Sequence, residues 1–115
     1  MKHRLLELES LAPGEARAVV AGGTQIVLVR TREGQVSALR NRCAHRGARL
    51  SYGFVEPELD ADEVGRYRTS GAYVLRCPWH GYEFNTVTGV CVADRRVRVQ
   101  TYEVAVEDGV IVVDL

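Results

Sequence analysis

The sequence predicts an all-β protein that folds as a single domain, residues 1–115. Short β-prone runs are separated by turns that contain glycine, several runs alternate apolar and polar residues, and no segment shows sustained helical periodicity. A chain of 115 residues is the size of one compact domain, and a hydrophobic content of 46% is enough to build a core. We therefore expect a soluble, globular protein.

The first half of the chain contains four predicted strands. The segments 4–11 and 15–21 are β-prone runs, and a Pro-Gly pair between them favours a turn. The segments 24–31 and 35–41 flank a Glu-Gly turn, which is the pattern of a β-hairpin.

The second half contains one regular hairpin and one irregular region. Residues 96–107 alternate with a period of two, turn at Asp108 and Gly109, and return through residues 110–115, so we predict a second hairpin. Residues 55–73 are acidic first and then basic, with one proline and two glycines. We interpret this region as a surface excursion, either a solvated loop or an irregular hairpin, and docking of a partner is the alternative.

Composition and patterning argue against several classes of protein. Fifteen basic and fifteen acidic residues give a formal net charge of zero, which disfavours non-specific nucleic-acid binding. No apolar run approaches the roughly 20 residues that span a bilayer, and Glu7 and Glu9 interrupt the segment where a secretory signal would lie. We expect a cytoplasmic protein without a membrane segment. Disulfides are rare in that compartment, so clustered cysteines and histidines favour a metal site or catalysis.

Two short motifs carry the chemistry. Cys43 and His45 stand in NRCAHRG, and Cys77 and His80 stand in RCPWHGY. Each motif combines one thiolate with one imidazole, in a segment whose glycine or proline residues favour a tight loop. Two such loops that approach one another can hold one metal centre between them.

These motifs resemble those of the Rieske 2Fe-2S proteins, whose pattern is Cys-x-His, a variable spacer and Cys-x-x-His. The resemblance extends through NRCAHRGARLSYG and CPWHGYEFNTVTG, which are similar to the two cluster-binding loops of Rieske-type ferredoxins in ring-hydroxylating dioxygenase systems. It implies an antiparallel β-sandwich with a small cluster-binding subdomain formed by two loops, at about residues 41–89 with an insertion at about 55–72. It also implies a Rieske-type 2Fe-2S cluster, with Cys43 and Cys77 on one iron and His45 and His80 on the other.

The mixed ligand set has an electrostatic consequence. Two ferric ions, two sulfides and two thiolates sum to zero when the histidines are neutral, whereas four thiolates would leave two negative charges. An electron enters a neutral site more easily, so the reduction potential lies roughly hundreds of millivolts above that of a plant-type ferredoxin.

Three functions are compatible with these residues. The leading one is a monomeric single-electron carrier, not itself an enzyme, that takes electrons from an NAD(P)H-dependent flavoprotein reductase and passes them to a terminal oxygenase. The first alternative is the Rieske small subunit of a larger oxidoreductase such as a nitrite reductase. The second is a structural zinc module, because two cysteines and two histidines also satisfy tetrahedral zinc.

The sequence departs from the respiratory Rieske proteins, which carry a disulfide between the loops and hydroxyls that bond the sulfurs. Here Ala48, Trp79, Tyr82 and Phe84 occupy the matching positions, so we expect a potential of the ferredoxin type. The third cysteine, Cys91, is predicted to be a buried apolar residue on a strand.

Charged residues surround the first loop. Arg42, Arg46 and Arg49 are interpreted as solvated charge, and contact with an acidic partner is the alternative. The spacer between the two motifs, residues 46–76, is longer than is usual in ferredoxins of this kind and leaves the choice of partner open.

Overall fold

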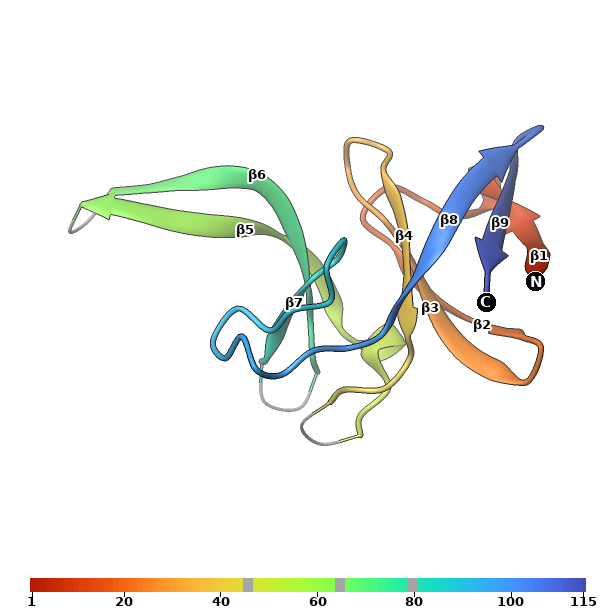
Figure 1. Ribbon diagram of the computed structural model, residues 1–115. Helices are drawn as coiled ribbons and strands as arrows, with labels where there is room; N and C mark the ends of the chain where they lie inside the picture. The colour runs from red at the N-terminus through yellow and green to blue at the C-terminus, as the bar shows by residue number, and fades with distance from the viewer. Residues whose placement is uncertain (45–46, 64–65, 79–80) are drawn as a thin grey trace.

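The computed structural model describes residues 1–44, 47–63, 66–78 and 81–115. For residues 59–63 and 66–71 it describes the backbone alone, and elsewhere in these ranges it also describes the side chains. It contains two antiparallel sheets, which confirms the all-β prediction (Figure 1). The other regular elements in the described part of the chain are two single-turn 3-10 helices, η1 (Leu8–Ser10) and η2 (Leu50–Tyr52). No helix in those ranges has the length and apolar character needed to cross a membrane.

The larger sheet has six strands in the order β1-β9-β8-β4-β3-β2, and every neighbouring pair is antiparallel. The outer strands β1 and β2 also contact one another, so the sheet curls around a core. The strands are β1 (Lys2–Glu7), β2 (Ala16–Ala21), β3 (Thr24–Arg30), β4 (Val36–Arg40), β8 (Thr101–Glu107) and β9 (Val110–Asp114).

Strand β3 separates two cores. Its side chains alternate between the two faces of the sheet, as the period of a strand requires. Ile26 and Leu28 belong to the core inside the curled sheet, whereas Val27 and Val29 belong to a second core that also contains the cysteines. All four side chains are fully buried, so β3 anchors the region of the metal-binding motifs to the body of the domain.

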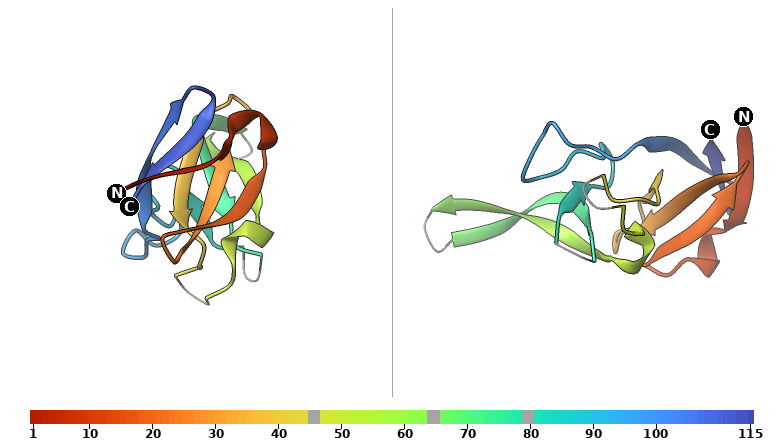
Figure 2. Two further views of the ribbon diagram at one scale, coloured as in Figure 1. Left: turned by 90° about the vertical axis from the view of Figure 1, so that its right-hand side faces the viewer. Right: turned by 90° about the horizontal axis from the view of Figure 1, so that it is seen from below.

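The smaller sheet has three strands, β5 (Phe54–Glu63), β6 (Arg66–Arg76) and β7 (Glu83–Asn85). Its two long strands extend away from the rest of the molecule (Figures 1 and 2). The predicted surface excursion is therefore a hairpin, and it is irregular because the pairing shifts register between Pro57 and Leu59 and again between Ala61 and Glu63.

Two predicted strands were too long. The first strand ends at Glu7, because residues 8–10 form η1. The Arg30 guanidinium donates hydrogen bonds to the carbonyls of Leu8 and Leu11 and so holds this turn. The strand predicted over residues 96–107 begins at Thr101. The alternation before it buries Val99 in the core beside the cysteines, but the Val99 N–H donates to the carbonyl of Gly89 at 2.9 Å, so this segment pairs with the turn after β7 and not with the larger sheet.

Both predicted hairpin turns are confirmed. Gly34 lies between β3 and β4 with φ +94°. Asp108 and Gly109 lie between β8 and β9 with φ values of +51° and +74°, the left-handed pair that a two-residue hairpin turn needs.

Candidate metal centre

The loop of the first motif follows β4 and is closed by two backbone hydrogen bonds. The Cys43 N–H donates to the carbonyl of Ala48 at 2.7 Å, and the Gly47 N–H donates to the carbonyl of Cys43 at 2.9 Å. Gly47 has φ +72°, which a residue with a side chain rarely adopts. These bonds bend the chain back on itself within the motif.

The loop of the second motif repeats this backbone arrangement. The Cys77 N–H donates to the carbonyl of Tyr82 at 2.7 Å, and the Gly81 N–H donates to the carbonyl of Cys77 at 3.2 Å. Gly81 has φ +71°, close to the value at the glycine of the first loop. The two motifs are thus built alike, although their sequences share only arginine, cysteine, histidine and glycine.

An arginine packs on the glycine of each loop. The guanidinium of Arg42 lies 3.3 Å from the position that a Cβ on Gly47 would take, and the guanidinium of Arg76 lies 3.2 Å from the same position on Gly81. Arg76 also forms an ion pair with Glu56, at 3.7 Å between Nη1 and Oε2. Each loop therefore has a positive charge against its backbone.

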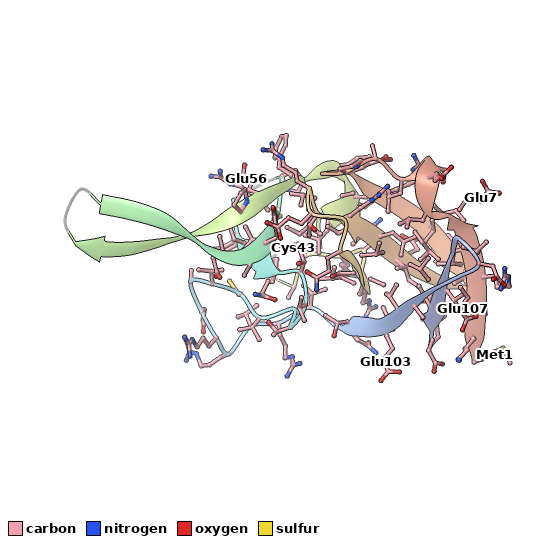
Figure 3. The ribbon with its side chains drawn as sticks, turned by 90° about the horizontal axis from the view of Figure 1, so that it is seen from above. Met1, Glu7, Cys43, Glu56, Glu103 and Glu107 are labelled. Carbon is pink, nitrogen blue, oxygen red and sulfur yellow. The ribbon has the colours of Figure 1, made fainter. Side chains whose placement is uncertain are left out.

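The two predicted cysteine ligands lie in one buried cluster. Cys43 and Cys77 are each 1% exposed, and neither forms a disulfide with another described residue. Figure 3 shows Cys43 where the two sheets meet. The other two predicted ligands, His45 and His80, lie outside the described residues, as do Arg46 and Trp79.

The remaining predictions near the site agree with the structure in part. Cys91 is fully buried in the same cluster as predicted, but it forms an isolated bridge with Phe84 and does not lie within a strand. Ala48 and Phe84 are buried, and Tyr82 packs against the cluster.

Two residues that hold the first loop were not anticipated. The Asn41 side chain accepts a hydrogen bond from the Ser51 N–H at 2.8 Å and donates one to the Ser51 hydroxyl at 3.0 Å. Asn41 is 5% exposed, so this pair joins the two ends of the loop inside the protein. The available sequence signal was a polar residue at the end of an apolar strand, directly before the cysteine motif.

Comparison with known proteins identifies the class. Residues 2–103 match the family described as the Rieske [2Fe-2S] domain, and the chain belongs to that family. Its cofactor is accordingly a Rieske-type 2Fe-2S cluster. The described donors fit this cofactor, because two buried cysteines outside any disulfide occupy equivalent positions in two loops with the same backbone hydrogen bonds.

Relatives of the chain fall into two groups by length. The chain is 29% identical to the ferredoxin component of the naphthalene 1,2-dioxygenase/salicylate 5-hydroxylase systems of Ralstonia sp., over 88% of this chain and 83% of that protein. It is 31% identical to cholesterol 7-desaturase nvd 1 of Ciona intestinalis, over 78% of this chain but 16% of the relative. The chain thus spans a small part of the longer relatives.

Solved structures give the same fold. The structure of an NADH-dependent nitrite reductase small subunit from Mycobacterium tuberculosis superposes with a TM-score of 0.83 and 27% identity, over 98% of this chain and 93% of that one. The ferredoxin of carbazole 1,9a-dioxygenase from Nocardioides aromaticivorans superposes with a TM-score of 0.76 and 26% identity, over 98% and 96%.

Proposed function

We propose that this protein is a single-electron carrier whose cluster is held by Cys43 and Cys77 on one iron and by His45 and His80 on the other. The observation that carries the proposal is the repeated loop, which places one buried thiol in each of two equivalent backbone turns. When bound, the cluster supplies a site for one electron with little change in its surroundings.

The protein's own residues do two things for such a site. The buried core around Cys43 and Cys77, to which Leu50, Leu75 and Phe84 contribute, excludes water from the thiolate side. The two closed loops keep the backbone in one geometry, so little reorganisation is needed when the charge changes.

For the partners, we propose an NAD(P)H-dependent flavoprotein reductase as the electron donor and a terminal oxygenase as the acceptor. The support is the ferredoxin component of Ralstonia sp., which this chain matches over most of the length of both proteins. A chain in the solved complex of oxygenase and ferredoxin of carbazole 1,9a-dioxygenase is also similar to this protein, with a TM-score of 0.73 and 28% identity over 91% of that chain.

A second candidate is the small subunit of a nitrite reductase. The observation that favours it is the TM-score of 0.83 to the small subunit from Mycobacterium tuberculosis, which exceeds the 0.76 of the carbazole ferredoxin. In both candidates the chain carries electrons for a larger enzyme, so the difference lies in the partner.

The cluster and its ligands are tested by spectroscopy of the purified protein. We expect a brown protein whose visible absorption bleaches partly when dithionite adds one electron per chain. Replacing any of the four ligands, for example by Cys43→Ser or His80→Ala, should abolish the absorption. Cys91→Ala is the matched control, because Cys91 is equally buried but is not among the four proposed ligands. A colourless protein that holds zinc would refute the proposal.

The two candidates are separated by purification from the native source under mild conditions. A large nitrite reductase subunit that stays bound to the chain would support the second candidate. An isolated chain that is reduced by a flavoprotein reductase with NAD(P)H would support the first.

A further inference from the structure

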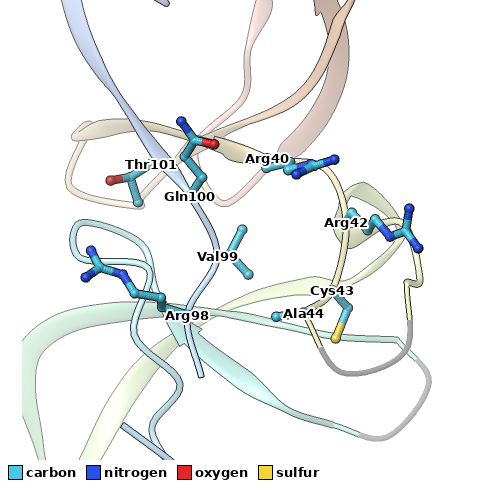
Figure 4. Close-up of a pocket in the computed structure, with 8 residues that line it drawn as sticks. All are labelled: Arg40, Arg42, Cys43, Ala44, Arg98, Val99, Gln100 and Thr101. Atoms are coloured by element: carbon cyan, nitrogen blue, oxygen red, sulfur yellow. The ribbon is translucent and has the colours of Figure 1, made fainter. Parts of the chain in front are cut away.

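A groove lined by arginines lies beside the first cysteine loop. Two adjacent depressions, of about 600 and 530 Å³, share Arg40 and Arg42 in their walls. Arg98 lines the first depression and Arg49 lines the second. Figure 4 shows the first depression, with Arg98 on one side, Arg42 on the other and Cys43 beside it. We call Arg40, Arg42, Arg49 and Arg98 together the arginine groove.

The fold brings these residues together from distant parts of the sequence. Arg40 ends β4, and its N–H donates to the carbonyl of Gln100 at 2.9 Å, so the segment that contains Arg98 lies against the end of β4. Arg42 packs on Gly47 within the first loop, and Arg49 follows that loop. The groove is thus held by a backbone hydrogen bond between the end of β4 and the segment before β8, and by the packing of Arg42 within the first loop.

The charge of the groove is uncompensated within the described part of the molecule. All four arginines are exposed, and the described residues that line the two depressions include no carboxylate. Among the described side chains, no ion pair joins any of the four to an acidic residue. Glu7 and Glu107 lie at the opposite end of the larger sheet (Figure 3). A chain of zero net charge therefore has a concentrated positive field beside Cys43.

We propose that the arginine groove docks an acidic segment of the redox partner, a peptide that carries several aspartate or glutamate residues. The inference rests on the proposed function, and it adds the chemistry of the docking partner. Planar guanidinium groups bind carboxylates with paired hydrogen bonds, and charge complementarity speeds the encounter of two proteins. Because the groove adjoins the Cys43 loop, docking there brings the partner next to the site of electron exchange.

Two other occupants fit the groove less well. Pockets for small molecules are mostly apolar and enclosed, whereas the walls of this open groove carry four guanidinium groups and the amides of Gln25, Asn41 and Gln100. Nucleic acid binds along an extended surface with an excess of basic residues, whereas this chain has a formal net charge of zero.

The probe for the test is a fluorescently labelled dodecaglutamate peptide, titrated with the holoprotein and followed by anisotropy at low salt. The double substitution Arg40→Glu with Arg98→Glu should weaken binding at least about tenfold, because it reverses charge in the groove. It leaves Arg42 in place, which packs on the loop. The matched control is Arg4→Glu with Arg32→Glu, which changes the net charge equally at exposed sites outside the groove and should change binding less than about twofold.

Several outcomes would overturn the proposal. They are equal losses in the two double variants, equal binding of a dodecaglutamine peptide, or groove-dependent binding of a thymidine oligonucleotide as tight as that of the acidic peptide. If the reversed variant does not fold by circular dichroism, Arg40→Gln with Arg98→Gln should still weaken binding at least about threefold.

The failure of this inference is distinguishable from failure of the proposed function. Reduction of the unaltered holoprotein by dithionite tests the electron-carrier function and does not depend on binding at the groove. A reducible cluster without groove-dependent peptide binding contradicts the docking inference alone. Groove-dependent binding by a protein without a reducible cluster contradicts the electron carrier and retains the groove.

Discussion

Gly53 lies against the backbone carbonyl of Arg76 so closely that a Cβ on Gly53 would overlap the oxygen. The contact joins the end of η2 to the strand that leads into Cys77, and therefore joins the two halves of the metal centre. Gly53→Ala should destabilise the protein by about 1–3 kcal/mol, because neither backbone segment can yield without disturbing the pairing of β5 with β6. Urea unfolding measures this loss.

The control for Gly53→Ala is Gly23→Ala, where an added Cβ meets no atom within 4 Å, although its φ of +80° adds a strain that Gly53 lacks. The Gly53 variant should also take up less cluster per chain than the control does. Full cluster content and unchanged stability in Gly53→Ala would show that the contact is unimportant.

The glycines of the two loops should be sensitive for two reasons. Gly47→Ala and Gly81→Ala each force a side chain into the left-handed region, at a cost of about 1–2 kcal/mol. Each new Cβ also presses on the guanidinium of Arg42 or Arg76, so we expect cluster content to fall as well. Absorbance per chain and thermal unfolding report the two effects separately.

Gly109→Ala isolates the backbone effect in this comparison. Gly109 has φ +74°, but an added Cβ there has open space around it. This variant should lose similar stability and keep its full cluster content. A loss of cluster in Gly109→Ala equal to that in the loop variants would contradict the role of the arginine contacts.

The Asn41 side chain should be needed to hold the first loop. Asn41→Ala removes the acceptor of the partly buried Ser51 N–H, which costs about 1–3 kcal/mol. Ser51→Ala removes only the hydroxyl and leaves that N–H bonded to Asn41, so the loss should be smaller. Denaturant unfolding of the two variants tests the order, and a larger loss in Ser51→Ala would reverse the assignment.

Glu15 should make stability depend on pH. The Ala12 N–H donates to its carboxylate at 2.8 Å, and this bond, assisted by Arg17, lowers the pKa of Glu15 below the ordinary 4.5. A lowered pKa in the folded state stabilises the protein above the ordinary pKa, and this stabilisation disappears as the pH falls through the folded value. Because the Glu15 side chain is 30% exposed and its bond to Ala12 is open to solvent, we expect Glu15→Gln to cost only about 0.5–1 kcal/mol near neutral pH.

Urea unfolding at several pH values tests this prediction. The difference in unfolding free energy between the wild-type protein and Glu15→Gln should be constant above the ordinary pKa of 4.5 and narrow as the pH is lowered from there to about 3. Glu33→Gln serves as the control, because Glu33 lies in an exposed turn. A gap that stays constant over this range would argue against the carboxylate as its cause.

The sequence by itself determined the local features of this protein. Alternation with a period of two and glycine turns predict strands and hairpins because they follow from the geometry of neighbouring residues. The Cys-x-His and Cys-x-x-His motifs likewise identify the metal-binding loops, because each motif is a short, continuous segment. These features needed no knowledge of distant contacts.

Only the tertiary structure decided how those segments combine. Alternation around Val99 predicts a strand, but its backbone N–H donates to Gly89, so this segment pairs with the turn after β7 and joins the sheet only from Thr101. Arg40 and Arg98 are remote in the sequence and line one depression only because β4 lies beside the chain that enters β8. Asn41 and Ser51 show the same point, since their bonds exist only once the loop between them has closed. Pairing across such separations depends on long-range packing, which local sequence pattern does not encode.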